Sequence, residues 1–296
     1  MELGRTIWRA IPCGLGPELQ RAPWVLSSPA RRSIEERFKL STDDLLISLA
    51  QMIAKAADVP SAAGLCISTG NVYLGPSLRL GTSRMTALDV LLANVFIHGE
   101  RGLNAIASTE ALTYQNSHVL RETATFSETR WLEIRPLGSS HSHPLVRDVI
   151  PNEGAAGQAQ ADIAAGDCFQ HGNFSTLDVE SFEDSNLGQT SLAKAAAVRS
   201  YSPSFDDVCA GCTLRTSDGR LFAGSAIGTF SRNGEISPLM SALVSMGAKA
   251  GGAYHDLDSV VWTAVDDNPE VQDMCSRDNQ LLKRIAPSAA FTPHAV

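Results

Sequence analysis

The hydrophobic and polar positions of residues 192–246 predict a helix, two strands joined by a turn, and a second helix. The alanine-rich stretch 192–198 favours a helix. Residues 209–216 have the mixed apolar and polar pattern of a strand, and Ser-Asp-Gly at 217–219 favours a turn before the return strand. Apolar residues at helical spacing predict one buried face on the second helix: Leu239, Leu243 and Met246.

The same order of elements is predicted earlier in the chain. Residues 64–67 have the pattern of a strand and follow a helix that Pro60 ends. Gly-Asn-Val-Tyr-Leu-Gly at 70–75 then resembles Gly-Arg-Leu-Phe-Ala-Gly at 219–224, and 219 − 70 = 149 residues separate the two motifs. The repeat predicts an α/β fold with a duplicated domain, each copy a mixed β-sheet with helices on both faces.

Helices and strands outside these motifs are also predicted. Residues 41–57 form a helix with Ser41 as its N-cap. Its buried face contains Leu45, Leu46, Leu49, Met52, Ile53 and Ala56. The helix from about Ala87 to His98 is richer in apolar residues. This predicts either that the helix is buried by packing within its own chain or that it faces a neighbouring chain. The last elements are a strand at 260–265, a helix near 279–284 and a short tail.

Three motifs, taken in their order, resemble the cytidine deaminase family. Ala-Ala-Val-Arg-Ser-Tyr-Ser-Pro at 196–203 is similar to the family's Ala-Ala-Asn-Arg-Ser-Tyr-Ala-Pro. Gly-Glu-Arg-Gly-Leu-Asn at 99–104 is similar to its Gly-Glu-Arg-x-Leu-Asn, and Ile-Ala-Pro at 285–287 to its Ile-Ser-Pro. The resemblance covers about residues 41–290 and is to the long form of plants and enteric bacteria. It implies two cytidine-deaminase-like domains, of which the C-terminal one has lost its site.

The resemblance also implies where a zinc site should lie, and this chain departs from the pattern there. The family needs His-x-Glu at one helix start and Pro-Cys-x-x-Cys at the next, so that Zn²⁺ activates water and the Glu moves a proton. The matching positions hold Thr86, Leu88, Thr113 and Asn116. None of them is an imidazole or a thiolate, and Leu88 cannot transfer a proton. We therefore expect no catalytic residue, no zinc and no other cofactor.

The sugar-binding positions implied by the resemblance are changed as well. The family holds the ribose with Asn-x-Glu, and the matching residues here are Ser77 and Arg79. Arginine in place of glutamate reverses the charge and removes the acceptors that a sugar hydroxyl needs. We expect the substrate site to be degenerate together with the metal site.

Composition indicates a globular chain without a membrane span. Its 296 residues are 44% hydrophobic and 19% charged, and no apolar run approaches the ~20 residues that cross a bilayer. The net charge of −8 disfavours nucleic acid as the main partner, and six scattered cysteines indicate no disulfide framework. The expected organisation is an N-terminal extension, a first domain, a linker and a second domain, at residues 1–40, 41–150, 151–188 and 189–296.

The extension 1–40 lies outside the resemblance and is rich in arginine and poor in acidic residues. That composition is typical of targeting to a mitochondrion or plastid, with a cytoplasmic location as the alternative. Trp8 and Trp24 are candidate anchors on a protein partner. Three alternatives stay open: an arm packed on a partner, a segment draped over its own domain and, less favoured, a targeting presequence that is cleaved.

Two further motifs permit chemistry but have simpler explanations. His141 and His143 lie in a Gly- and Ser-rich loop with no third ligand nearby in sequence, which favours a solvated loop over a metal site. Cys209 and Cys212 form a lone Cys-x-x-Cys on a predicted strand. Cys212 is therefore expected in the core, and a redox pair is the alternative.

Three functional classes follow. The first is an inactive cytidine-deaminase-like protein that serves as a structural or accessory subunit of a larger, organellar assembly. It would contact protein partners through residues 1–40 and the 87–98 helix, with a homodimer left open. The second is a pseudoenzyme that binds a nucleoside or another small ligand as a regulator. The third is an enzyme with changed chemistry, which lacks an evident nucleophile and base.

Overall fold

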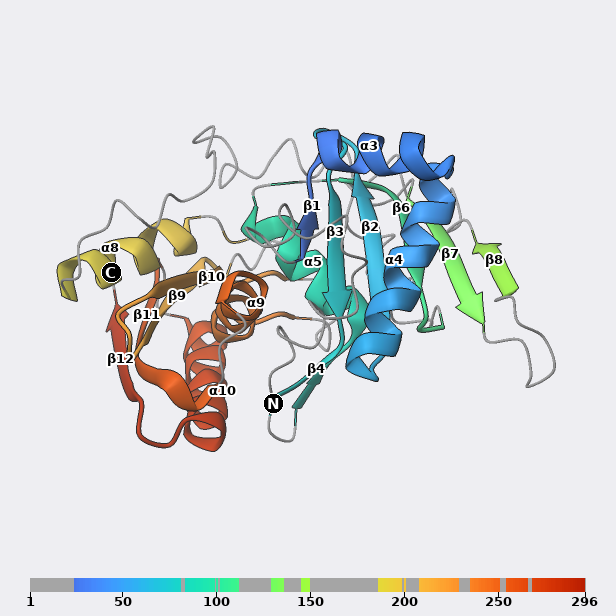
Figure 1. The fold of residues 1–296 in the computed structure, drawn as a ribbon. Helices are drawn as coiled ribbons and strands as arrows, with labels where there is room; N and C mark the ends of the chain where they lie inside the picture. The colour runs from blue at the N-terminus through green and yellow to red at the C-terminus, as the bar shows by residue number, and fades with distance from the viewer. Residues whose placement is uncertain are drawn as a thin grey trace.

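The computed structural model describes residues 24–80, 83–98, 102–111, 129–135, 145–149, 186–198, 208–228, 235–250, 254–265 and 268–295, with Glu100 and Ser200. The first half of the chain builds a six-stranded sheet of order β1-β3-β2-β6-β7-β8. Its strands are β1 (Val25–Leu26), β2 (Ser61–Cys66), β3 (Val72–Pro76), β6 (Leu103–Ser108), β7 (Arg130–Arg135) and β8 (Leu145–Val149). Its helices are α3 (Ser28–Phe38), α4 (Thr42–Ala57) and α5 (Ala87–Ile97). Figure 1 shows α4 and α5 on opposite faces of this sheet.

The second half builds a four-stranded sheet of order β10-β9-β11-β12. Its strands are β9 (Ala210–Thr216), β10 (Leu221–Ser225), β11 (Leu257–Ala264) and β12 (Ala290–Ala295). Its helices are α8 (Asn186–Ala197), α9 (Pro238–Ala250) and α10 (Pro269–Ile285), with a short 3-10 helix, η5 (Tyr254–Asp256). Gly211 packs on α8, whereas Gly224, the partner of Cys212 on the next strand, packs on α9. Because neighbouring residues of a strand point to opposite faces, α8 and α9 cover the two faces of this sheet.

The two halves share the same four-stranded arrangement, β3-β2-β6-β7 in the first and β10-β9-β11-β12 in the second, which confirms the predicted duplication. In the first, β2 pairs antiparallel with β3 and β6, and β6 pairs parallel with β7. In the second, β9 pairs antiparallel with β10 and β11, and β11 pairs parallel with β12. The repeated motifs form equivalent hairpins, whose turns place Gly70 at φ +69 and Gly219 at φ +85. Only glycine adopts these angles without steric cost, which explains why both motifs begin with a glycine.

The predicted helix at 41–57 is confirmed as α4. Ser41 is its N-cap and forms a capping box with Asp44, in which each side chain accepts a hydrogen bond from the other residue's backbone N–H. The buried face contains Leu45, Leu46, Leu49 and Ile53, with Met52 partly buried against it.

Residues 24–38 belong to the first half, and this corrects one predicted contact. Trp24 is only 1% exposed. The Trp24 carbonyl accepts hydrogen bonds from the Leu74 backbone N–H at 2.9 Å and from Asn94 Nδ2 at 2.9 Å. Trp24 is therefore a core residue rather than a partner anchor, because the adjoining strand β1 extends the sheet beside β3. Trp8 lies outside the described residues, and the boundaries of the predicted domains stay a prediction.

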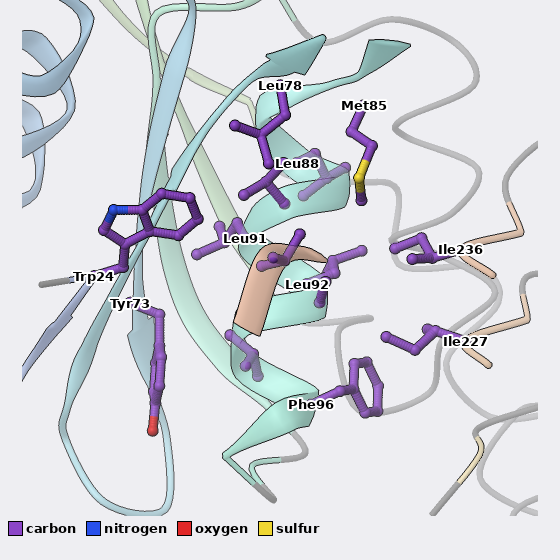
Figure 2. Packing of buried hydrophobic residues seen from close by; sticks show 14 of the residues in the cluster. Trp24, Tyr73, Leu78, Met85, Leu88, Leu91, Leu92, Phe96, Ile227 and Ile236 are labelled. Carbon is purple, nitrogen blue, oxygen red and sulfur yellow. The ribbon is translucent and has the colours of Figure 1, made fainter. Parts of the chain in front are cut away.

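The prediction that the 87–98 helix contacts another chain is also wrong for its described side chains. Leu88, Leu91 and Leu92 of α5 are all buried. The helix packs on β2 and β3 and also contacts α9 of the second half. Figure 2 shows Trp24 and Tyr73 beside one side of α5, with Ile227 and Ile236 of the second half beside the other. A helix that is apolar all round must be covered on every side, and here the covering element belongs to the same chain.

The end of the chain is more regular than predicted. The helix near 279–284 is confirmed but begins earlier, since α10 starts at Pro269 after the N-cap Asn268. The expected short tail is instead strand β12, which pairs parallel with β11 at the edge of the sheet. Among the described helices, none is long and apolar enough to cross a membrane.

Candidate functional site

The N-terminal end of α5 is where the resemblance implies a metal ligand and a general acid/base. Thr86 is the N-cap of this helix and forms a capping box with Asp89. The Thr86 backbone N–H donates to Asp89 Oδ2 at 2.8 Å, and the Asp89 N–H donates to Thr86 Oγ1 at 3.2 Å. The Thr86 side chain therefore satisfies one backbone donor of the helix start, the Asp89 N–H, as a Thr-x-x-Asp sequence favours.

Glu110, which follows β6, closes the same helix end from a second direction. Its Oε2 accepts a hydrogen bond from the Ala87 backbone N–H at 3.0 Å, and its Oε1 accepts one from Arg84 at 3.0 Å. Burial raises the pKa of Asp89, and the negative charge of Glu110 adds to the increase. The helix start thus holds two carboxylates of the protein itself, at the end where the helix dipole favours negative charge.

The other degenerate positions lie around this helix end or outside the described residues. Leu88 is 1% exposed and packs in the core. In Figure 2 its side chain lies below Leu78 of the small hairpin formed by β4 (Leu78–Leu80) and β5 (Ser83–Met85), with Met85 at the same end of the helix. Ser77 is also buried, whereas Arg79 is exposed on β4. Thr113 and Asn116 lie outside the described residues.

The second half closes the start of α9 with a carboxylate as well. Asp278 of α10 accepts hydrogen bonds from the Leu239 backbone N–H at 3.1 Å and from Trp262 Nε1 at 3.0 Å. Asp278 is 1% exposed, and burial raises its pKa to about 6. Asp278 was not among the predicted site residues. A signal was present, since Asp278 interrupts the apolar face of α10 formed by Val271, Met274, Leu281 and Leu282.

Glu100, from the Gly-Glu-Arg motif, forms a second buried polar cluster. Its Oε2 accepts hydrogen bonds from Cys66 at 2.9 Å and Ser68 at 2.5 Å, and its Oε1 accepts them from Thr69 at 2.7 Å and Tyr73 at 3.1 Å. Burial raises the pKa of Glu100, but these side-chain hydrogen bonds outweigh it and hold the pKa below its usual value. The cluster ties the segment after α5 to the β2–β3 turn.

The described residues do not fit a zinc ion. Within the described parts of the chain, no three His, Cys, Asp or Glu side chains group so that they could hold a metal. At the start of α5 the backbone N–H groups of Thr86 and Ala87 donate hydrogen bonds to the carboxylates of Asp89 and Glu110. The nearby Leu88 offers no atom that could bind a metal. No catalytic step through zinc can be derived from these residues.

The cysteine and histidine motifs have different outcomes. Cys209 and Cys212 are free thiols. Cys212 is fully buried, as expected for a core residue, and burial raises the pKa of its thiol. A thiol held protonated is a poor nucleophile, which disfavours the redox pair. His141 and His143 lie outside the described residues.

Comparison with known proteins relates the chain to cytidine deaminases. Residues 166–273 match the family described as the cytidine and deoxycytidylate deaminase zinc-binding region. The chain is 25% identical over 314 residues to Cytidine deaminase 1 of Arabidopsis thaliana, an alignment that covers 92% of this chain and 97% of that protein. The chain is therefore cytidine deaminase-like.

Solved structures of bacterial cytidine deaminases also match part of the chain. The enzyme from Burkholderia pseudomallei is 22% identical, with a TM-score of 0.30, 34% of this chain covered and 76% of that chain covered. The enzyme from Mycobacterium leprae is 24% identical, with a TM-score of 0.29, 35% of this chain covered and 82% of that chain covered.

Proposed function

We propose that this cytidine deaminase-like protein is catalytically inactive and serves as a structural or accessory subunit of a larger protein assembly. The observation that carries the proposal is the closed start of α5. Leu88 fills the core there, while Asp89, Glu110 and Thr86 accept hydrogen bonds from the backbone N–H groups of Thr86, Ala87 and Asp89. A metal and its water would have to displace these hydrogen bonds and would find no thiolate or imidazole among the described residues around them.

The start of α9 in the second half is closed as well, as the resemblance implies for the C-terminal domain. Asp278 and Trp262 are buried at the start of α9 and hydrogen-bonded to each other, so this end of the helix serves stability. Leu239, the residue whose N–H binds Asp278, is itself fully buried. Both copies of the fold thus use their helix starts for packing and capping rather than for an exposed reactive group.

The first prediction concerns zinc and deamination. We expect the purified protein to hold much less than one zinc per chain and to convert no cytidine or deoxycytidine above the uncatalysed background. The reason is that Thr86, Leu88, Thr113 and Asn116 stand where the resemblance implies metal ligands and a general acid/base. Elemental analysis and a coupled ammonia-release assay would measure both, with an active cytidine deaminase purified in parallel as the positive control. One zinc per chain together with turnover would contradict the proposal.

The second prediction concerns assembly. Deleting residues 1–23 leaves β1 and Trp24 in place, so we expect the fold to persist while incorporation into the native assembly weakens. Size-exclusion chromatography of native extracts, together with thermal unfolding, would report both properties. Deleting residues 1–34 is the control for a folding defect. It removes Trp24, Leu26 and Ile34 from the core and is expected to lower the melting temperature.

Unchanged assembly of the 1–23 deletion would contradict an arm that binds a partner.

Cellular location is part of the same proposal, because the arginine-rich composition of residues 1–40 is typical of organelle import. Cell fractionation of the full chain and of the 1–23 deletion would test whether a mitochondrion or plastid takes up the protein. Recovery of the full chain in the cytosol alone would contradict that part of the proposal.

A further inference from the structure

The small hairpin above the start of α5 carries two arginines in directly opposite positions. Arg79 of β4 (Leu78–Leu80) is the register partner of Arg84 of β5 (Ser83–Met85). Directly opposite residues of an antiparallel pair lie on the same face, with their Cβ atoms about 4.5–5.5 Å apart. Both side chains are exposed. Like charges in this arrangement destabilise a strand pair, so the two arginines lower the stability of the hairpin.

The opposite face of the hairpin explains why both arginines point to solvent. Leu78, Leu80 and Met85 are each 6% exposed or less. Figure 2 shows Leu78 and Met85 directed toward the first turn of α5. Since side chains alternate along a strand, burial of these three residues places Arg79 and Arg84 together on the outer face.

The two arginines differ in their contacts. Arg84 forms an ion pair with Glu110 at 3.0 Å. Glu110 also binds the Ala87 N–H, so both of its oxygens are engaged. Arg79 forms no ion pair or hydrogen bond with the part of the chain that the structure describes. Within the described residues, Arg79 therefore has no acidic partner and lies beside a second arginine, in a protein whose net charge is −8.

We propose that Arg79 and Arg84 bind the phosphate group of a small phosphorylated molecule. A guanidinium presents a planar fork of N–H donors that matches phosphate oxygens. Each of two adjacent guanidinium groups can therefore donate hydrogen bonds to two oxygens of the same phosphate group. A phosphate monoester carries about −1.5 to −2 charges at pH 7, enough to compensate Arg79 and to relieve the repulsion across the hairpin. A single carboxylate supplies less charge and fewer acceptors. This inference goes beyond the proposed subunit role and does not depend on it.

Inorganic phosphate is the probe for this site. We expect phosphate at ten times its Kd to raise the melting temperature of the full chain by about 2–4 °C relative to chloride at equal ionic strength. Arg79→Gln is expected to weaken phosphate binding at least tenfold by isothermal titration calorimetry and to abolish the shift. The matched control is Arg32→Gln, an exposed arginine of α3, which should leave the affinity unchanged.

A measurement without phosphate separates binding from a structural role. Removing Arg79 ends the like-charge contact, so Arg79→Gln in phosphate-free buffer should melt at the same temperature as the parent or higher. A lower melting temperature with an undiminished phosphate shift would make Arg79 a structural residue and overturn the proposal. No phosphate shift in the parent chain, or equal shifts in the parent and Arg79→Gln, would overturn it as well.

Discussion

Replacing Gly224 by alanine is expected to lower the free energy of unfolding by more than about 3 kcal/mol, and Gly75→Ala should act similarly in the other half. A Cβ at Gly224 would lie 2.1 Å from the Ala242 backbone N and 2.3 Å from the Pro238 carbonyl O. At Gly75 it would lie 2.5 Å from the Ala87 O and the Leu91 N. These are backbone atoms, so relief requires moving a whole helix away from its sheet.

Gly64→Ala is the matched control for this prediction. Its Cβ would meet only side-chain atoms, the nearest being Leu91 Cδ2 at 3.1 Å and Leu103 Cδ2 at 3.2 Å. Because side chains can rotate, we expect a loss below about 1.5 kcal/mol. Urea denaturation of the three variants would measure the differences. Comparable losses for Gly64→Ala and Gly224→Ala would contradict the idea that close helix–sheet approach makes the glycines of the repeat necessary.

The duplication could be predicted because its signals are local. Gly70 and Gly219 mark turns that require positive φ, and Gly75 and Gly224 mark where a helix approaches a strand. The last strand, β12, could not be predicted in the same way. Its sequence includes Pro293, and it forms only because β11 offers a parallel edge far away in the sequence.

The contacts of the candidate site also differ in whether a local sequence pattern indicates them. The capping box joins Thr86 to Asp89, three positions further on, and is readable from sequence. Glu110 reaches Ala87 across 23 positions, and Asp278 reaches Leu239 across 39, so no local pattern indicates either contact. The burial of Trp24 likewise depends on the edge of β3, which composition does not reveal.

Asp278→Ala is expected to destabilise the second half by about 2–4 kcal/mol. The substitution leaves the Leu239 N–H and the Trp262 Nε1–H buried without their acceptor. Asp273→Asn is the control on the same helix, because Asp273 is exposed and its ion pair within the described residues is with Arg277 at the surface. Its effect should stay within about 0.5 kcal/mol. Equal effects of the two substitutions would show that the start of α9 does not depend on Asp278.

Asp278 also predicts how stability depends on pH. Burial raises its pKa from 3.8 to about 6, so between these values the folded chain binds more protons at this carboxyl than the unfolded chain does. The stabilising contribution is therefore complete below pH about 4 and is lost as pH rises through about 6. At about 1.4 kcal/mol per pKa unit, the change is on the order of 3 kcal/mol.

The variant Asp278→Asn, which keeps the side-chain shape and one acceptor oxygen but does not titrate, isolates this contribution. Other carboxylates, such as Asp218 with its pKa lowered to about 2 by the hydrogen bond from Arg220, contribute equally to parent and variant and cancel in the difference. Relative to the parent, the variant should gain stability as pH rises from 4 to 7. Urea denaturation at half-unit steps would follow this difference, and a constant difference would mean that the Asp278 carboxyl titrates alike in folded and unfolded chains.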